Sequence, residues 1–306
     1  AFVTFWGTIF PLLSEAVQNQ KVTVGAPFYN QVNGPLFLVL LVLMGIGPLL
    51  AWRRTSTTGL ARSLRWPTAA AALLAAALWL AGLRSWAGIS GFTVCLFVIG
   101  TILVEYWRGV RARRRTAGEG YGEALVTLVS RNRRRYGGYV VHLAIVVIAA
   151  GTIGSTFFQS ERELTMKLGE TAQVGRYTIT YRGLDTWTEP GVRIVAADVL
   201  ATSNGGFVGV LSPQKLFYRG WERQETTLVA VHTTLPWVED LYVVLSGWDA
   251  AENSAVLHVF VNPLVSLIWA GGGLFLIGNV VAFWPVPARR RQVVPARPVP
   301  VLSPES

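Results

Sequence analysis

Five stretches of this sequence are long and apolar enough to cross a lipid bilayer. A crossing of about 30 Å of hydrocarbon takes about 20 mostly apolar residues in a helix. Runs of this kind occur at Pro35–Trp52, Pro67–Leu83, Ser90–Trp107, Gly137–Phe158 and Pro263–Trp284. The sequence therefore predicts an integral membrane α-helical bundle. Its 52% apolar and 14% charged residues are typical of such a protein and not of an ordinary soluble domain.

The first thirteen residues are apolar as well, but as a helix they reach only about 20 Å at 1.5 Å per residue. The chain begins with Ala1, and it shows neither the charged region nor the cleavage site of a signal peptide. We therefore expect a partial N-terminal helix, and we expect the sequence to be a piece of a longer membrane protein.

The arginines predict the orientation. The segments after the first run, the third run and the last run carry four, nine and four arginines, and the two alternate short loops carry one basic residue each. Because short loops rich in Lys and Arg stay in the cytoplasm, we expect these three segments to be cytoplasmic, including the C-terminal tail. The net charge of +10 is thereby explained by topology, which argues against nucleic acid as a partner.

One long segment outside the membrane, Gln159–Val261, has the alternating pattern of short half-buried strands separated by turn residues. It predicts a small extracytoplasmic all-β domain, a sandwich or barrel of about seven strands. The expected organisation is a helical region at 1–158, the β-domain at 159–261, a final transmembrane helix at 262–285 and a basic, Pro-rich cytoplasmic tail at 286–306.

A further element is expected on the cytoplasmic side. Tyr121–Arg135 carries apolar residues at helical spacing and a basic end. It predicts an amphipathic helix along the inner membrane surface, or equally an amphipathic linker packed on the ends of the bundle.

His142 stands out because an ionisable side chain inside a span should face a partner, a cavity or a cofactor. Gly138 and Arg135 precede it by four and seven residues, so all three share one stripe of the helix. A flat ring could approach over Gly138, His142 could ligate haem iron, and Arg135 could bind a propionate. The alternatives are a histidine bonded to a neighbouring helix, a Gly-Gly pair that permits close helix packing, and arginines that only set topology.

The remaining candidates carry less chemistry. One cysteine, Cys95, excludes an internal disulfide, and three histidines in all argue against a multi-histidine metal centre. His258 precedes the last span and could meet a ligand at the outer membrane surface, whereas His232 has a weaker case. Glu105, at the end of the third run, is interpreted as an interfacial residue.

Six strings in order resemble the C-terminal half of CcmF, the haem lyase subunit of the bacterial cytochrome c maturation system. They are TIFPLLSEA (Thr8–Ala16), VGAPFYNQVNGPL (Val24–Leu36), LMGIGPLLAWRR (Leu43–Arg54), RNRRRYGGYVVHL (Arg131–Leu143), DLYVVL (Asp240–Leu245) and VNPLVSLIWAGG (Val261–Gly272).

The resemblance implies a structural haem b with two transmembrane histidine ligands, of which His142 is one and the other lies outside this chain. It further implies an inner-membrane location and a transient haem substrate. The implied partners are the N-terminal half of the same CcmF-like protein, a CcmE-like haem chaperone, CcmH-type proteins and apocytochrome c. The tryptophan-rich region that presents haem is not in this sequence, so no catalytic residue is assigned and the chain alone is not expected to attach haem.

Two other classes of function remain open. A transporter subunit for haem or another small molecule is one, although the spans hold few charges. A non-catalytic scaffold that docks partners through its outer domain is the other.

Overall fold

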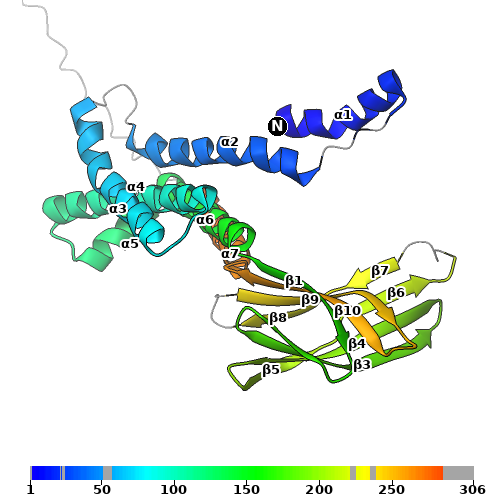
Figure 1. Ribbon diagram of the computed structural model, residues 1–306. Coiled ribbons are helices and arrows are strands. Elements are labelled where there is room, and N and C mark those ends of the chain that lie inside the picture. The colour runs from blue at the N-terminus through cyan, green and yellow to red at the C-terminus, as the bar shows by residue number, and fades with distance from the viewer. Residues whose placement is uncertain are drawn as a thin grey trace, which may run out of the picture.

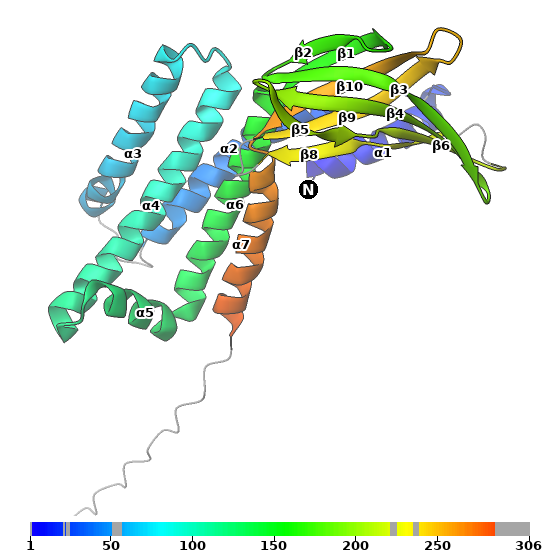
Figure 2. The ribbon, with the colours of Figure 1, turned by 90° about the horizontal axis from the view of Figure 1, so that it is seen from below.

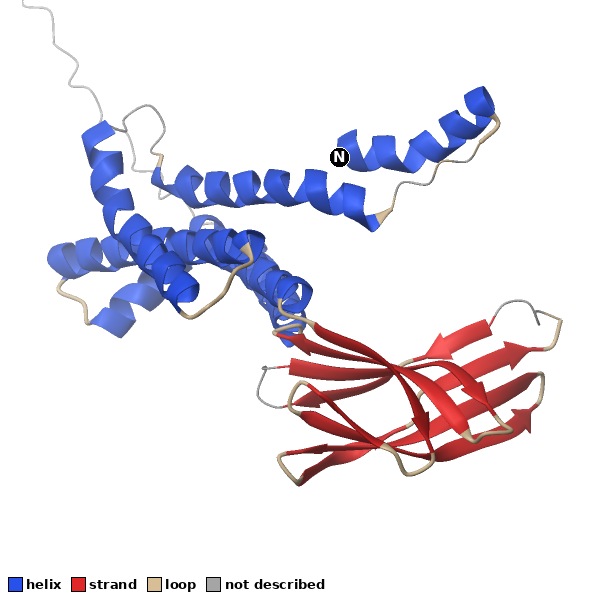
Figure 3. Ribbon diagram, in the orientation of Figure 1, coloured by secondary structure: helices blue, strands red, loops and turns tan. Residues whose placement is uncertain are grey.

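The computed structural model describes residues 2–20, 22, 25–50, 57–220, 225–234 and 239–284. The described part contains a helical bundle and a β-sandwich attached to one end of it (Figures 1 and 3). The helices are α1 (Phe2–Gln18), α2 (Ala26–Ile46, followed by a 3-10 turn at Gly47–Leu49), α3 (Thr57–Leu80), α4 (Trp86–Ala117), α5 (Tyr121–Arg131), α6 (Arg133–Phe157) and α7 (Ser266–Phe283).

Five helices, α2, α3, α4, α6 and α7, are long and apolar enough to cross a membrane, which confirms the predicted bundle. Several extend beyond the apolar runs. α4 continues past Trp107 to Ala117 because arginine is a good helix former, and it ends where Gly118 adopts a left-handed conformation at φ 67°. α1 continues past the thirteen apolar residues to Gln18. The predicted tail at 286–306 lies outside the described residues.

The amphipathic segment is divided between two helices. α5 ends at Arg131, Asn132 leaves the helical conformation at φ −131° and ψ 47°, and Arg133 begins α6. α5 crosses the bundle at the end away from the β-sandwich (Figure 2). Its residues Ala124 and Leu128 are buried. The prediction of a single helix from Tyr121 to Arg135 is therefore wrong at its C-terminal end.

The β-domain has ten strands in the described residues, and not about seven. They are β1 (Ser160–Lys167), β2 (Thr171–Val174), β3 (Tyr177–Glu189), β4 (Val192–Ser203), β5 (Gly206–Leu211), β6 (Gln214–Tyr218), β7 (Glu225–Leu228), β8 (Ala230–Thr234), β9 (Glu239–Asp249) and β10 (Ser254–Pro263). One apolar stretch contains both β2 and β3, because Gly175 turns the chain at φ 59°. A second apolar stretch, at 226–234, contains most of β7 and all of β8, and the five-residue β6 is a further short strand.

The strands form two antiparallel sheets that pack face to face. One has the order β1-β10-β9-β8, and the other has the order β2-β3-β4-β6-β7 with β5 also paired to β4. Alternate residues of β9 and β10 point into the core; Leu245 and Leu257, for example, are fully buried. They meet Tyr177, Ile179 and Tyr181 of β3, so a continuous apolar core lies between the sheets.

α6 and α7 pack against each other through glycines. A Cβ placed on Gly271 of α7 would lie 2.9 Å from the backbone nitrogen of Ile148 in α6. A Cβ placed on Gly278 would lie 2.8 Å from the backbone nitrogen of Val141. A Cβ on Gly137 of α6 would lie 2.6 Å from the backbone nitrogen of Ala282. Small residues allow helix backbones in a membrane to approach closely and gain van der Waals contact. The two helices that flank the β-domain are thus packed tightly.

We predict that Gly271→Leu lowers the stability of the protein by about 1–3 kcal/mol, the usual cost of overpacking. Its Cβ would meet Ile148 Cγ1 at 2.6 Å, whereas nothing lies within 4 Å of a Cβ on neighbouring Gly272. Thermal unfolding in detergent measures the effect, with Gly272→Leu as the matched control. Equal midpoints for the two variants would refute the proposed packing.

Candidate functional site

The contacts of α6 with α4 and α7 define the face on which His142 lies. Tyr139 and Val146 face α4, where the Tyr139 hydroxyl donates to Glu105 and the Cys95 thiol contacts the Val146 carbonyl. Gly137 and Val141 face α7. Because α6 turns by about 100° per residue, His142 and Gly138 lie together on the remaining side. The predicted neighbours His142 and Gly138 therefore share one face of α6.

The His142 ring is partly buried but unpartnered. Its Nδ1 atom is buried without a hydrogen-bond partner in the described part of the chain, and no hydrogen bond to either ring nitrogen occurs there. The alternative that His142 bonds to a neighbouring helix finds no support among these residues. A buried polar atom without a partner is costly, so its position calls for a ligand or another partner.

The two glycines before His142 have different environments. Gly137 contacts α7 closely, so its role is helix packing. Nothing lies within 4 Å of a Cβ placed on Gly138. The surface one turn from His142 is therefore flat and open, and a planar ring could lie there. A histidine beside such a surface fits an axially ligated haem, since neutral imidazole is a usual ligand of haem iron.

Arg135, the third predicted residue, contacts α4. Its Nη2 donates to Glu105 Oε2 at 2.5 Å, and its Nε donates to the Tyr139 hydroxyl at 2.8 Å. The side chain is 56% exposed, and its Nη1 donates to no described residue. Arg135 thus serves as a helix-to-helix contact while part of its guanidinium remains accessible.

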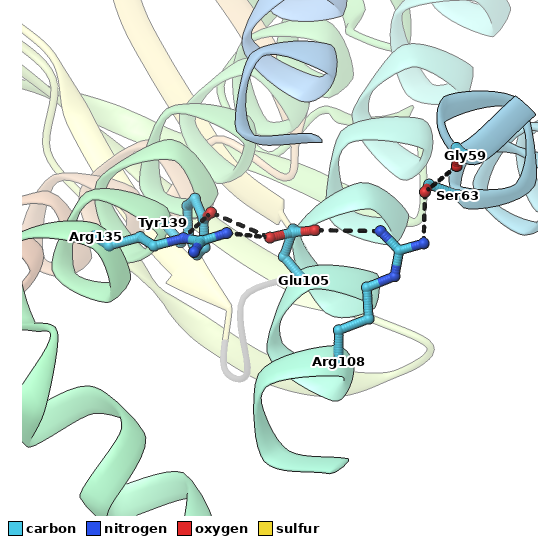
Figure 4. Close-up of polar contacts among 6 residues, drawn as sticks. All are labelled: Gly59, Ser63, Glu105, Arg108, Arg135 and Tyr139. Atoms are coloured by element: carbon cyan, nitrogen blue, oxygen red, sulfur yellow. Dashed lines mark hydrogen bonds and ion pairs between the residues drawn. The ribbon is translucent and has the colours of Figure 1, made fainter. Parts of the chain in front are cut away.

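Glu105 lies at the centre of a polar network that joins three helices (Figure 4). It is 8% exposed and also contacts Arg108 Nη1 at 3.5 Å. Arg108 Nη2 in turn donates to the Ser63 hydroxyl of α3 at 2.5 Å, and Ser63 donates to the Gly59 carbonyl at 2.8 Å. The Glu105 carboxylate is thus buried and paired within the bundle, while its depth at the membrane interface stays a prediction.

Three tyrosines fill the space beside this network. The ring centroids of Tyr106, Tyr136 and Tyr139 lie between 5.1 and 5.9 Å from one another. The Tyr106 hydroxyl also donates to the Tyr136 carbonyl at 3.0 Å. Packed aromatic rings exclude water from the Glu105 carboxylate and thereby strengthen its ion pairs.

The two other histidines lie on strands of the β-domain. His258 Nε2 is 2.6 Å from Glu161 Oε1, and its ring lies 4.1 Å from that of Phe260. His232 is on β8, beside Gly209 of β5. The described residues contain no group of three His, Cys, Asp or Glu side chains that could hold a metal ion. The His258 ring nitrogen Nε2 is thus already engaged with Glu161 within the β-domain.

The junction between the β-domain and α7 carries a buried carboxylate. Asp240 is 4% exposed, and Ser266, the first residue of α7, donates to its Oδ1 at 3.4 Å. Burial, together with the nearby Asp240 carboxylate, raises the pKa of Tyr242. This contact ties β9 to the start of the last span.

Comparison with known proteins matches both parts of the chain. The family described as CcmF C-terminal beta-sandwich matches residues 157–263. A cytochrome c-type biogenesis protein CycK from Rhizobium meliloti is 30% identical over 276 residues, which are 90% of this chain and 40% of the relative. CcmF from Pseudomonas aeruginosa is 29% identical over 278 residues, with the same coverage.

A solved structure with the name Cytochrome c Heme Lyase CcmF superimposes with a TM-score of 0.74 and 27% sequence identity. The match covers 93% of this chain and 43% of that chain. The chain therefore spans about two fifths of the length of the relatives that it matches.

We predict that Glu105→Gln lowers stability by about 1–3 kcal/mol, because it leaves two arginines without their carboxylate partner. The loss should fall below that of a fully buried pair, since Arg108 and Arg135 are each about half exposed. Chemical unfolding in detergent measures it. Glu15→Gln, at an exposed position of α1, is the control and should leave stability unchanged. A Glu105→Gln protein as stable as wild type would show that the network contributes nothing.

Proposed function

This chain is CcmF-like in sequence and in fold, and on that premise we propose that it is part of a haem lyase complex in cytochrome c maturation. The observation that carries the proposal is the unpartnered His142 beside the open surface of Gly138. In the proposed complex, this chain supplies one axial ligand of a membrane haem b, and the second ligand comes from outside the chain.

His142 has the properties that an axial ligand needs. Neither ring nitrogen is engaged in a hydrogen bond within the described residues, so one is available to donate its lone pair to iron. The fixed rotation of α6 between α4 and α7 holds the ring on the face that it shares with Gly138. Packing of this kind lets a ligand be oriented before the cofactor binds.

Arg135 is proposed to bind a haem propionate. Its Nε and Nη2 hold Tyr139 and Glu105, which fix the guanidinium in place, and its Nη1 remains free to donate to a carboxylate. A charge-assisted bond of this kind is stronger than one between neutral groups. Glu105 acts here as a positioning residue, since it touches Arg135 and not the proposed cofactor.

A haem bound at His142 would supply one-electron chemistry, and His142 and Arg135 of this chain would hold it. Covalent attachment of haem to a protein is assigned to the whole complex. We propose no catalytic residue in this chain.

The proposed topology places the arginine-rich end of the bundle in the cytoplasm and the β-sandwich in the periplasm. α5 and the β-sandwich lie at opposite ends of α6 and α7 (Figure 2), which agrees with that orientation. The proposed partners are the N-terminal half of a CcmF-like protein, a CcmE-like haem chaperone, CcmH-type proteins and apocytochrome c.

We predict that His142→Ala lowers haem b in the complex at least about tenfold. Loss of groups that merely orient a metal ligand already costs about 10–100-fold in affinity, so loss of the ligand itself should cost no less. The chain is co-expressed with the upstream part of a CcmF-like protein, and haem is quantified from a reduced-minus-oxidised spectrum.

His232→Ala on β8 is the control and should keep the wild-type haem content. Wild-type stoichiometry in the His142→Ala complex would contradict the ligand assignment. A wild-type complex without haem would contradict the proposal as a whole and favour a transporter or scaffold.

We predict that Gly138→Leu also lowers haem content, because its side chain would occupy the surface beside His142. The folded protein should keep its stability, since the added Cβ meets nothing within 4 Å. Gly273→Leu, on an equally open position of α7, is the matched control and should change neither property. Wild-type haem content in Gly138→Leu would show that no ring lies over this glycine.

A further inference from the structure

An open groove lies at the end of the bundle away from the β-sandwich. It has a volume of about 480 Å³ and is formed where α5 and the start of α6 approach the end of α7. Its lining is almost entirely apolar and consists of Leu125, Val126, Val129, Ser130, Arg133, Val280, Val281 and Trp284. The volume falls within the range of about 300–1,000 Å³ that is usual for small-molecule sites.

Arg133 is the one charged residue that lines the groove. It is half-buried, and no carboxylate pairs with it among the described residues. Other arginines at this end of the bundle do have partners, since Arg108 and Arg135 contact Glu105, and Arg113 contacts Glu119. A half-buried guanidinium without a counter-charge indicates a site for an anion.

The chain adds more positive charge at the same place. Arg131 and Arg134 flank Arg133 within three residues, and both are exposed. Arg131 also attracts the Glu119 carboxylate, whereas Arg134 forms no ion pair in the part that the structure describes. The first turn of α6 also begins here, and Asn132 makes no side-chain cap bond to it. The C-terminal end of α5 lies only two residues away, at Arg131, so the two opposite helix ends offset each other and the arginine side chains supply the positive charge.

We expect the groove to lie at the depth of the membrane surface. Trp284 directly follows the last apolar helix, where aromatic side chains are expected at the level of lipid headgroups. Val126 of α5 is 69% exposed on the amphipathic helix that forms one wall. Hydrocarbon chains can thus reach the apolar lining while a headgroup stays at the arginines.

We propose that this groove binds an anionic phospholipid, with an acyl chain along α5 and α7 and the phosphate held by Arg133. Arg131 and Arg134 supply the surrounding positive charge. A zwitterionic lipid would bring its ammonium group to the same three arginines, so the site should discriminate against it. This inference does not depend on the proposed haem site.

The test is native mass spectrometry of the full chain in detergent, with phosphatidylglycerol and phosphatidylcholine of identical acyl chains in equal amounts. The wild-type protein should retain phosphatidylglycerol about tenfold better. Because one arginine near the membrane surface contributes about 1 kcal/mol, Arg133→Gln should reduce that preference about fivefold. Arg115→Gln removes an exposed charge of α4 outside the groove and should leave it unchanged.

A second pair of variants tests the groove itself. Val280→Trp should fill it and lower the retention of both lipids, whereas Leu40→Trp, at an exposed position of α2, should not. Equal retention of phosphatidylglycerol and phosphatidylcholine by the wild-type protein would overturn the proposal. So would an Arg133→Gln protein that prefers phosphatidylglycerol as strongly as the wild type does. Undiminished lipid retention in Val280→Trp would place the lipid outside the groove and overturn the proposal as well.

Discussion

The close contact between α6 and α7 is the interaction on which the rest of the structure depends. α6 leads into β1, the first strand of the β-sandwich, and β10, the last strand, leads into α7. The distance between the two helices therefore sets the distance between β1 and β10, which pair with each other. The same contact fixes the rotation of α6 and therefore the direction in which His142 points. Leu264, at φ 61°, carries the chain from β10 into α7 and packs on Gly154 of α6. A bulky residue accepts this strained conformation only where its surroundings impose it.

The buried carboxylate of Glu105 connects α3 and α4 to α6. Glu105 brings a negative charge into an apolar bundle, and two arginines from opposite sides compensate for it. Because one arginine reaches Ser63 of α3 and the other belongs to α6, three helices meet through one side chain. Because these polar contacts are directional, they help to specify how α3, α4 and α6 are aligned along their axes.

Much of the fold could be predicted from the sequence, because hydropathy and alternation report directly on burial. The number of spans and the all-β nature of 159–261 are of this kind. Strand boundaries were less accessible, since β6 is short and Gly175 makes a turn inside a continuous β-pattern. The pairing of Glu105 was not accessible, because its partners Arg135 and Tyr139 belong to a different helix. The difference between Gly137 and Gly138 depends on the position of α7, which no local pattern contains.

The pairing of β1 with β10 determines the order in which this chain can fold during synthesis. β1 follows α6 at once, yet Ser160 pairs with Val261, about a hundred residues later and just before α7. The four-stranded sheet therefore cannot close until nearly the whole β-domain has been made. Its closure then delivers the next segment, α7, beside α6. The β-sandwich therefore holds the end of α6 and the start of α7 side by side, although about a hundred residues of chain separate them.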